Sequence, residues 1–160
     1  SSGEEAYTLA MIMQDYFYNI KQLWDKKILA TDISTRVLET ARRGEYKNKD
    51  IEPLPLYWRT NYFKKIDDEK SVINDKIKNE VIFRSFNLMN GNFPFKKKFH
   101  VIFCRNVMIY FDVQTKNQLV RKFYNFMEPG GYLFIGHSES LNREDTKFRY
   151  IIPAVYRKEF

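Results

Sequence analysis

The chain has 160 residues, of which 44% are hydrophobic and 17% aromatic, enough for the core of one domain. No apolar run approaches the roughly 20 residues of a membrane span, and acids stand where a signal peptide would carry bases. We therefore predict a soluble, cytoplasmic protein without membrane insertion. The formal charge of +7 attracts acidic partners, but the bases are scattered. An acidic protein surface is thus at least as good a partner as nucleic acid.

The amino-terminal stretch predicts a helix that begins behind a small, flexible loop. Ser1, Ser2 and Gly3 lead into Glu4. Apolar residues then recur at helical spacing, at Ala6, Leu9, Ala10, Met13, Phe17 and Ile20. The amino end of such a helix can receive polar groups of a ligand, but first-turn acids also complement the helix dipole. We assign Glu5 to the dipole and keep both roles open for Glu4.

A short buried strand is predicted from Ile28 to Ile33, with Asp32 at its end. Ser34 can cap the following helix, which Gly44 stops. An acid at this place in nucleotide-binding α/β folds accepts hydrogen bonds from both ribose hydroxyls. The alternative for Asp32 is a capping or turn role.

The chain changes character from Glu45 to Glu80, which is charged and aromatic and contains Pro53 and Pro55. We predict a connection with a small hairpin or helical excursion at about residues 60–80. A charged, aromatic excursion of this kind is a natural place for partner contact.

Two further strands are predicted to end in polar residues. Val81 to Phe86 leads into Asn87, which can pair with an adenine edge or form a turn. Phe99 to Cys104 is almost continuously apolar, as in a strand covered on both faces, and Arg105 and Asn106 follow it. The carboxyl ends of parallel strands are where ligands bind in open α/β sheets, so Arg105 is a site candidate, or else a solvated strand-end cation.

The remainder predicts a helix, a strand and a closing antiparallel pair. Asp112 can cap a helix that Glu128–Gly131 terminates, and a strand from Tyr132 to Gly136 follows. Two more apolar pieces surround Pro153. His137, Ser138 and Glu139 are adjacent, so they cannot converge as a nucleophilic triad. No metal-ligand spacing occurs, and the single cysteine, Cys104, is expected to pack inertly.

Five segments together resemble the CheR-type chemotaxis-receptor glutamate methyltransferases. They are SSGEEAYTLAM from Ser1, ATDIS from Ala30, FNL from Phe86, CRNVMIYFD from Cys104 and GHSES from Gly136. The resemblance runs to about Arg157. It implies an α/β fold with a doubly wound, mostly parallel, Rossmann-like sheet of the S-adenosylmethionine-dependent methyltransferase type and a small inserted subdomain, in a single catalytic domain over residues 1–160.

The resemblance also implies a reaction and residues that serve it. The methyl group of S-adenosyl-L-methionine passes to a receptor glutamate, leaving S-adenosyl-L-homocysteine. An anionic carboxylate needs no general base, only alignment. Arg105 and Tyr110 would hold the acceptor, although Tyr110 could instead cap the next helix as a packing aromatic. The cofactor residues would be Glu4, Asp32, Asn87, Leu88, Cys104, Arg105 and Asn106.

Three expectations depart from the family pattern. The chain begins inside the glycine-rich loop, so the first, central strand and an amino-terminal helical domain are expected to be missing. The stretch from Phe63 to Lys76 has no glycine, which predicts that no receptor carboxyl-terminal pentapeptide tether docks there.

A non-catalytic cofactor-sensing or scaffold module remains the alternative. A nucleic-acid methyltransferase would need an Asn/Asp-Pro-Pro-aromatic motif at Cys104–Asp112, and an oxidoreductase a complete GxGxxG.

Overall fold

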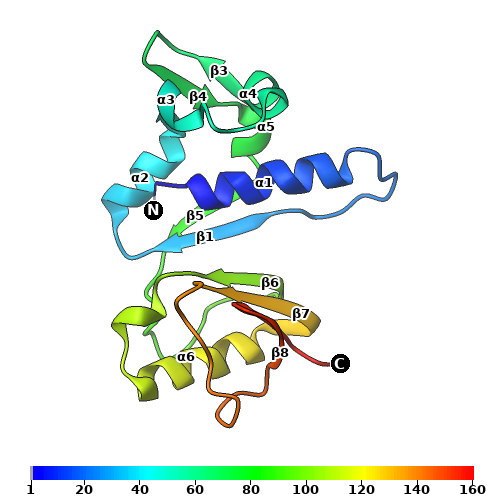
Figure 1. Ribbon diagram of the computed structural model, residues 1–160, viewed down its shortest axis with the longest axis vertical. Helices are drawn as coiled ribbons and strands as arrows, with labels where there is room; N and C mark the ends of the chain where they lie inside the picture. Colours follow the sequence, from blue (N-terminus) through cyan, green and yellow to red (C-terminus); the bar gives the residue numbers. More distant parts are fainter. Residues whose placement is uncertain (1) are drawn as a thin grey trace. The chain divides into compact units, whose positions relative to one another are not determined.

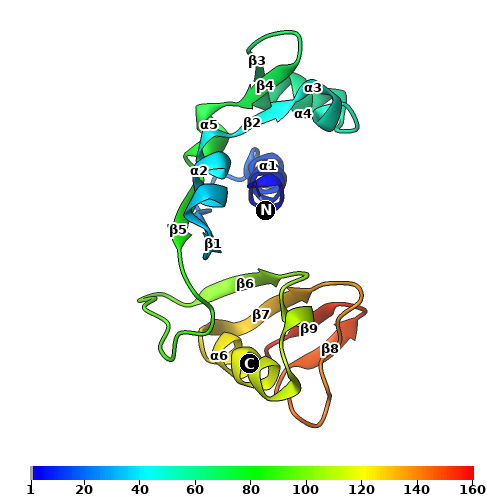
Figure 2. The same cartoon turned by 90° about the vertical axis from the view of Figure 1, so that its left-hand side faces the viewer.

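The computed structural model describes residues 2–160 and divides the chain into two compact units, Ser1–Asn87 and Leu88–Phe160. Each unit has its own sheets (Figure 1, Figure 2). No helix among the described residues is long and apolar enough to cross a membrane.

The first unit is built around a parallel pair of strands. Its elements in chain order are α1 (Glu4–Phe17), β1 (Ile28–Asp32), α2 (Thr35–Arg43), β2 (Glu45–Lys47), α3 (Asn48–Ile51), α4 (Leu56–Tyr62), β3 (Phe63–Lys65), β4 (Lys70–Ile73), α5 (Asp75–Lys78) and β5 (Val81–Ser85). β1 and β5 pair in parallel, from Ile28 opposite Val81 to Asp32 opposite Ser85. α1 and α2 both contact this pair. Parallel neighbours need a crossover connection, and helices lie between β1 and β5 in the chain. The predicted alternation of strands and helices is therefore present.

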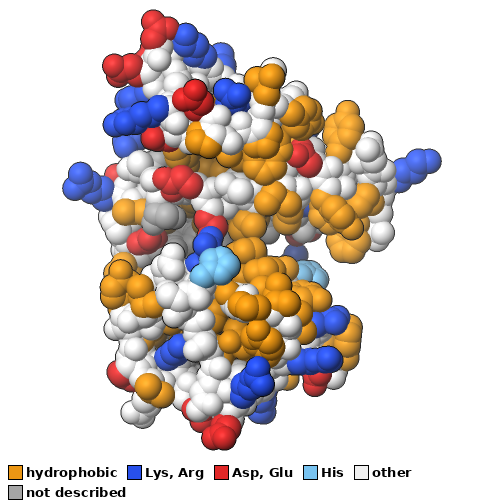
Figure 3. Space-filling model, in the orientation of Figure 1, with side chains coloured by type: hydrophobic (Ala, Val, Ile, Leu, Met, Phe, Trp, Pro, Cys, Tyr) orange, Lys and Arg blue, Asp and Glu red, His pale blue; other side chains and the backbone are white. Residues whose placement is uncertain are grey.

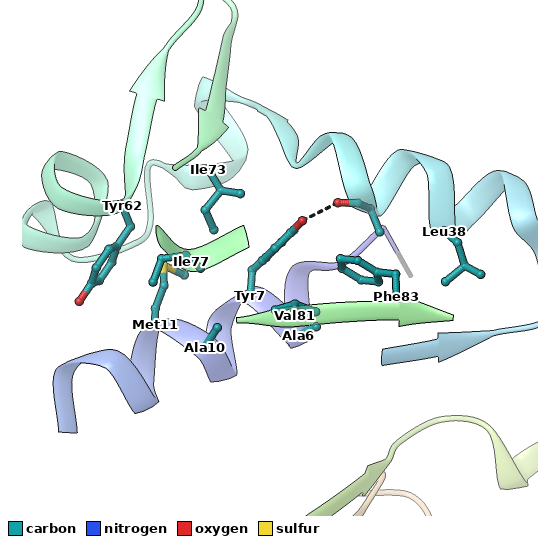
Figure 4. Packing of buried hydrophobic residues seen from close by; sticks show 11 residues of the cluster. Ala6, Tyr7, Ala10, Met11, Leu38, Tyr62, Ile73, Ile77, Val81 and Phe83 are labelled. Carbon is teal, nitrogen blue, oxygen red and sulfur yellow. Dashed lines mark hydrogen bonds between the residues drawn. The ribbon is translucent and has the colours of Figure 1, made fainter. Parts of the chain in front are cut away.

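The core of the first unit forms where α1 meets β5 and α5 (Figure 4). The buried residues of α1 are Ala6, Tyr7, Ala10, Met11 and Gln14. The Tyr7 hydroxyl donates a 2.7 Å hydrogen bond to the Ala41 carbonyl, and burial raises the pKa of Tyr7 to about 12. The predicted apolar face is thus partly wrong, since Leu9 and Met13 are only half-buried and Ile20 lies exposed beyond the helix. The reason is that α5, which the sequence pattern did not place, packs against the Tyr7–Met11 side.

The ends of α2 follow the predicted capping residues. Ser34 Oγ accepts a 3.3 Å hydrogen bond from the Val37 backbone N–H. Gly44 ends the helix in the left-handed region, with φ of +63°, and a Cβ there would lie 2.7 Å from Ile73 Cγ2. Only glycine fits this turn without strain.

A small antiparallel sheet, in the order β2-β4-β3, follows α2. The predicted excursion contains the hairpin of β3 and β4, in which Phe63 lies opposite Ile73. The third strand, β2, lies in a stretch that we expected to be a connection, because three residues carry no readable periodicity.

The helix α4 beside this sheet is tied to α1 by one carboxylate. Asp15 accepts a 2.6 Å hydrogen bond from Trp58 Nε1 and another from the Tyr62 hydroxyl. Burial, then the hydrogen bond to Asp15, raises the pKa of Tyr62 well above its usual value. The small sheet is therefore anchored to the first helix of its unit.

The second unit contains a four-stranded sheet in the order β6-β7-β9-β8. Its elements are β6 (Phe99–Cys104), the 3-10 helix η1 (Met108–Tyr110), α6 (Val113–Asn125), β7 (Met127–Ile135), β8 (Arg149–Ile152) and β9 (Val155–Arg157). β6 and β7 are parallel, whereas β9 is antiparallel to both β7 and β8, as predicted for the closing pair. Asp112 caps α6 by accepting a 2.8 Å hydrogen bond from the Thr115 N–H. α6 lies against one face of the sheet in both views (Figure 1, Figure 2).

Two predictions in this unit are wrong in detail. The Glu128–Gly131 stretch does not end α6, because β7 already begins at Met127 and this stretch bulges within it. The Gly130 N–H donates to the Lys158 carbonyl and the Lys158 N–H to the Gly131 carbonyl, so the bulge is paired. Nor is β6 covered on both faces. His100 and Val101 in the middle of the strand are exposed, Val101 by 45%.

The α/β class and the parallel pairing of the predicted fold are confirmed. The parallel strands are divided between two sheets, and β1 and β6 each have one neighbour among the described residues.

Candidate functional site

The loop after β1 presents Asp32 on a tight local turn. Asp32 Oδ1 accepts a 2.9 Å hydrogen bond from the Ser34 N–H, and Ser34 in turn caps α2. One carboxylate oxygen of Asp32 therefore has the turn role that was the alternative to ligand binding. This does not exclude ligand binding, because a carboxylate has about four lone-pair sites.

A small pocket opens beside Asp32 within the first unit. Its walls are Gly3, Ala6, Ala30, Thr31, Asp32, Leu38 and Phe83. Small and apolar side chains thus surround one carboxylate. The carboxylate is an acceptor that suits a pair of sugar hydroxyls, but the pocket, at about 40 Å³, holds no more than a small part of a nucleoside.

Glu4 lies at the beginning of α1, next to the pocket residue Gly3. Gly3 precedes the helix with φ of +95°, and Glu4 is exposed and accepts a 2.5 Å hydrogen bond from Ser2 Oγ. Burial, and then the charge of Glu4, raises the pKa of Tyr46 above its usual range. The Glu4 carboxylate is therefore held at the helix start, where both predicted roles remain available to it.

Asn87 and Leu88 follow β5 at the point where one unit ends and the other begins. Asn87 is exposed and Leu88 is half-buried. The backbone before them is fixed, since the Phe86 N–H donates a 3.0 Å hydrogen bond to the Asp32 carbonyl. The ends of the two strands, β1 and β5, are thus joined at Asp32, which is one of the pocket residues.

The loop after β6 carries the other predicted site residues. Cys104 is buried, as predicted for inert packing, whereas Arg105 and Asn106 are exposed. Tyr110, in η1, is 80% exposed. The alternative was that Tyr110 caps the next helix with Phe111, whereas the N-cap of α6 is Asp112 and the Tyr110 phenol stands in solvent on the same loop as Arg105.

Glu139 is a residue of this region whose role we did not predict from the sequence. Its side chain is only 7% exposed, and Oε2 accepts hydrogen bonds from the Gly136 N–H at 2.6 Å and the Asn106 N–H at 3.1 Å. Oε1 is buried and has no hydrogen-bond partner among residues 2–160. Leaving such an atom unsatisfied costs roughly 1–3 kcal/mol. His137 and Ser138 are exposed, so the three adjacent residues do not form a triad.

The sequence contains a local signal for the hydrogen bond between Glu139 and Gly136, but none for the hydrogen bond between Glu139 and Asn106. An acid three residues after a strand-ending glycine can bond back to that glycine, as here. The contact with Asn106 joins residues 33 apart and depends on the pairing of β6 with β7. The structure thus brings Arg105, Asn106 and Glu139 together in the second unit, while Glu4 and Asp32 belong to the first.

The chain matches the model of the family described as "CheR methyltransferase, SAM binding domain" over residues 1–156. It is 46% identical over 158 residues to the chemotaxis protein methyltransferase of Borreliella burgdorferi, covering 99% of this chain and 56% of that protein. It is 35% identical over 159 residues to the chemotaxis protein methyltransferase of Escherichia coli K12, covering 98% and 55%. The chain therefore spans about half the length of these curated relatives.

Among solved structures, the glycopeptide N-methyltransferase MtfA matches with a TM-score of 0.43 and 15% identity, over 68% of this chain and 36% of that one. The sequence matches carry the assignment by themselves. They confirm the predicted cofactor, because the matched domain is the one that binds SAM. The chain belongs to the CheR methyltransferase family, to its SAM-binding domain.

Proposed function

We propose that this chain is the catalytic domain of a methyltransferase that esterifies glutamate side chains of chemotaxis receptors for sensory adaptation. In this proposal residues 1–160 form one domain, with the small sheet as a partner-contact subdomain. The observation that carries it is an exposed arginine directly after β6 and an exposed tyrosine in η1 of the same loop, in a chain of the CheR family. That pair is suited to an anionic acceptor.

We assign the cofactor to polar residues at strand ends. Asp32 would accept hydrogen bonds from the ribose hydroxyls, and Glu4 would bind from the start of α1. Asn87, Leu88, Cys104 and Asn106 are assigned to the cofactor through the family resemblance. What S-adenosylmethionine supplies is an electrophilic methyl group on a sulfonium.

The acceptor side of the reaction is assigned to Arg105 and Tyr110. A guanidinium can hold a carboxylate through two parallel hydrogen bonds and so set which oxygen lone pair is presented. Tyr110 can donate one further hydrogen bond to an acceptor oxygen. A glutamate is already anionic at neutral pH, with an ordinary pKa near about 4.3, so neither residue needs to remove a proton.

The partner proposed is the cytoplasmic helical region of a chemotaxis receptor. The net charge of +7 favours approach to acidic helices. On the face drawn in Figure 3, lysines and arginines are scattered among acidic and hydrophobic side chains rather than gathered in a stripe, which favours a protein partner over nucleic acid.

We further propose that the receptor's carboxyl-terminal pentapeptide does not dock on the small sheet. The turn between β3 and β4 is closed by Asp67, whose Oδ1 accepts from the Glu69 and Lys70 N–H groups at 2.8 and 2.7 Å. It thus forms a compact polar turn in place of a glycine-containing loop. Measurable binding of a receptor pentapeptide to this chain would contradict this part of the proposal.

The test is calorimetric binding of S-adenosylhomocysteine to this chain and to a chimaera with the part of the Borreliella burgdorferi relative that the chain does not match. We expect the chimaera to bind more tightly, and Asp32→Asn to weaken binding about 10-fold or more, since hydrogen bonds to charged groups contribute about 1.5–3 kcal/mol. Asp50→Asn, at an exposed acid of the same unit, is the matched control. Binding by neither form would favour the non-catalytic scaffold.

A further inference from the structure

A buried carboxylate joins the loops that follow two neighbouring parallel strands. Glu139, in the loop after β7, accepts one hydrogen bond from its own loop, at the Gly136 N–H, and one from the Asn106 N–H after β6. Both bonds go to the same oxygen, Oε2, at 2.6 and 3.1 Å. The carboxylate therefore acts on the loop that presents Arg105.

The loop that carries Glu139 is itself held to two other elements. Lys116, in α6, donates a 2.5 Å hydrogen bond from Nζ to the Ser140 carbonyl. The Leu141 N–H donates a 3.1 Å hydrogen bond to the hydroxyl of Tyr156, in β9. The loop that carries Glu139 is thus held by α6 and β9 as well as by its own hydrogen bond to Gly136.

The backbone at Asn106 needs such support. Its φ is +58°, a left-handed conformation that asparagine tolerates but that few other residues adopt. The Asn106 nitrogen and the Arg105 carbonyl belong to one planar peptide group, so fixing the N–H direction also fixes the plane from which Arg105 departs.

Gly136 leaves room for this arrangement. A Cβ at Gly136 would lie 2.6 Å from both Asn106 Oδ1 and Glu139 Oε2. The contact between the two loops is thus close packed around one carboxylate, and no larger residue fits at the strand end.

We propose that Glu139 is a positioning residue for Arg105, which it orients through the peptide group of Asn106. The inference rests on the proposed function, in which Arg105 binds the acceptor carboxylate. A second anion beside that acceptor would normally repel it. The Glu139 side chain is buried and its Oε2 accepts from two backbone N–H groups, so it supports the loop without facing solvent.

The first measurement needs no activity and uses the chain itself. Amide hydrogen exchange of Asn106 and Gly136 is compared in the wild type, Glu139→Ala, Glu139→Gln and the control Glu144→Ala, which changes an exposed acid of the same loop. We expect exchange at Asn106 to accelerate at least 10-fold in Glu139→Ala only, because the glutamine amide oxygen can accept the same two hydrogen bonds. Unchanged exchange in Glu139→Ala would overturn the inference.

The second measurement is the rate of methyl transfer to a receptor fragment, with the form of the protein that binds S-adenosylhomocysteine. We expect Glu139→Ala to lower kcat about 10-fold and Glu139→Gln to restore most of the rate. In an Arg105→Ala background, Glu139→Ala should have no further effect, because it acts through Arg105.

Each contrary outcome has a distinct meaning. Equal losses with and without Arg105, or a glutamine variant as slow as the alanine variant, would overturn the positioning role alone. A loss that appears only in cofactor affinity or in melting temperature would do the same. A wild-type protein that transfers no methyl group would overturn the proposed function, and this inference with it.

Discussion

The loops after β1 and after β6 both present polar side chains at the carboxyl end of a parallel strand, but they are held in different ways. The loop after β1 is closed locally. Asp32 accepts from the N–H two residues ahead, and Ser34 caps the helix that follows. The loop after β6 is held by a carboxylate 33 residues further along the chain.

This difference separates two kinds of site residue. The side-chain turn at Asp32 closes within two residues, although the Asp32 backbone also pairs with β5. Arg105 and Asn106 depend on the pairing of β6 with β7 and on the loop that carries Glu139. We therefore expect distant substitutions to disturb the arginine loop and not the aspartate loop, and the following experiments test that contrast.

The largest effect is expected from Arg105→Ala. Removing the guanidinium should slow methyl transfer about 10- to 100-fold, because hydrogen bonds to charged groups contribute about 1.5–3 kcal/mol. Arg105→Lys should recover only part of the rate, since an ammonium is a point charge without the planar fork. Arg105 is exposed, so the melting temperature should not change. A full rate in the alanine variant would disprove the assigned role.

Gly136→Ala should give the next largest effect, on stability. The added Cβ would lie 2.6 Å from Asn106 Oδ1 and Glu139 Oε2, and overpacking of this kind costs typically about 1–3 kcal/mol. Urea unfolding measures the loss. Gly91→Ala is the matched control, because a Cβ there has nothing within 4 Å. Equal stability of the two variants would show that the two loops are not close packed.

Ser34→Ala should cost less, about 1 kcal/mol, by removing the hydroxyl that accepts from the Val37 N–H. Ser34→Asp should restore most of the loss, and Ser138→Ala, at an exposed serine, should change little. Chemical unfolding of the three variants checks this. Amide exchange at Asn106 should be the same in all three variants. Faster exchange there would contradict the contrast between the loop after β1, which nearby residues close, and the loop after β6, which the distant Glu139 holds.

The smallest effect is expected for Asp112→Asn, on the stability of the folded protein at acid pH. Hydrogen bonds from the Thr115 backbone and side chain hold the pKa of the Asp112 carboxyl below its usual value in the folded protein. Its contribution to stability is therefore complete above the unfolded pKa, near about 3.9. It is lost as the pH falls through the lower folded value. Asp112→Asn should reduce the acid dependence of unfolding below about pH 4 and leave unfolding at pH 7 less changed. If the wild type and Asp112→Asn lost the same stability below about pH 4, this prediction would be refuted.

The sequence by itself determined the features that short stretches encode. The caps at Ser34 and Asp112, the glycine stop at Gly44 and the ends of β1 and β6 lie where pattern and turn chemistry placed them. The family, the cofactor and the α/β class could likewise be predicted, because they rest on motifs of a few residues. The caps, the glycine stop and the strand ends are each decided by contacts within about one helical turn or one strand.

The tertiary structure alone decided which faces are buried and which residues support the site. α1 is rotated from its predicted face because α5 packs on the Tyr7 side, and the Glu128–Gly131 stretch bulges within β7 because Lys158 pairs with it. Glu139 supports Asn106 only because β6 and β7 are neighbours. Such contacts join residues far apart in the chain, and no local periodicity records them, so they are set only when the strands pair.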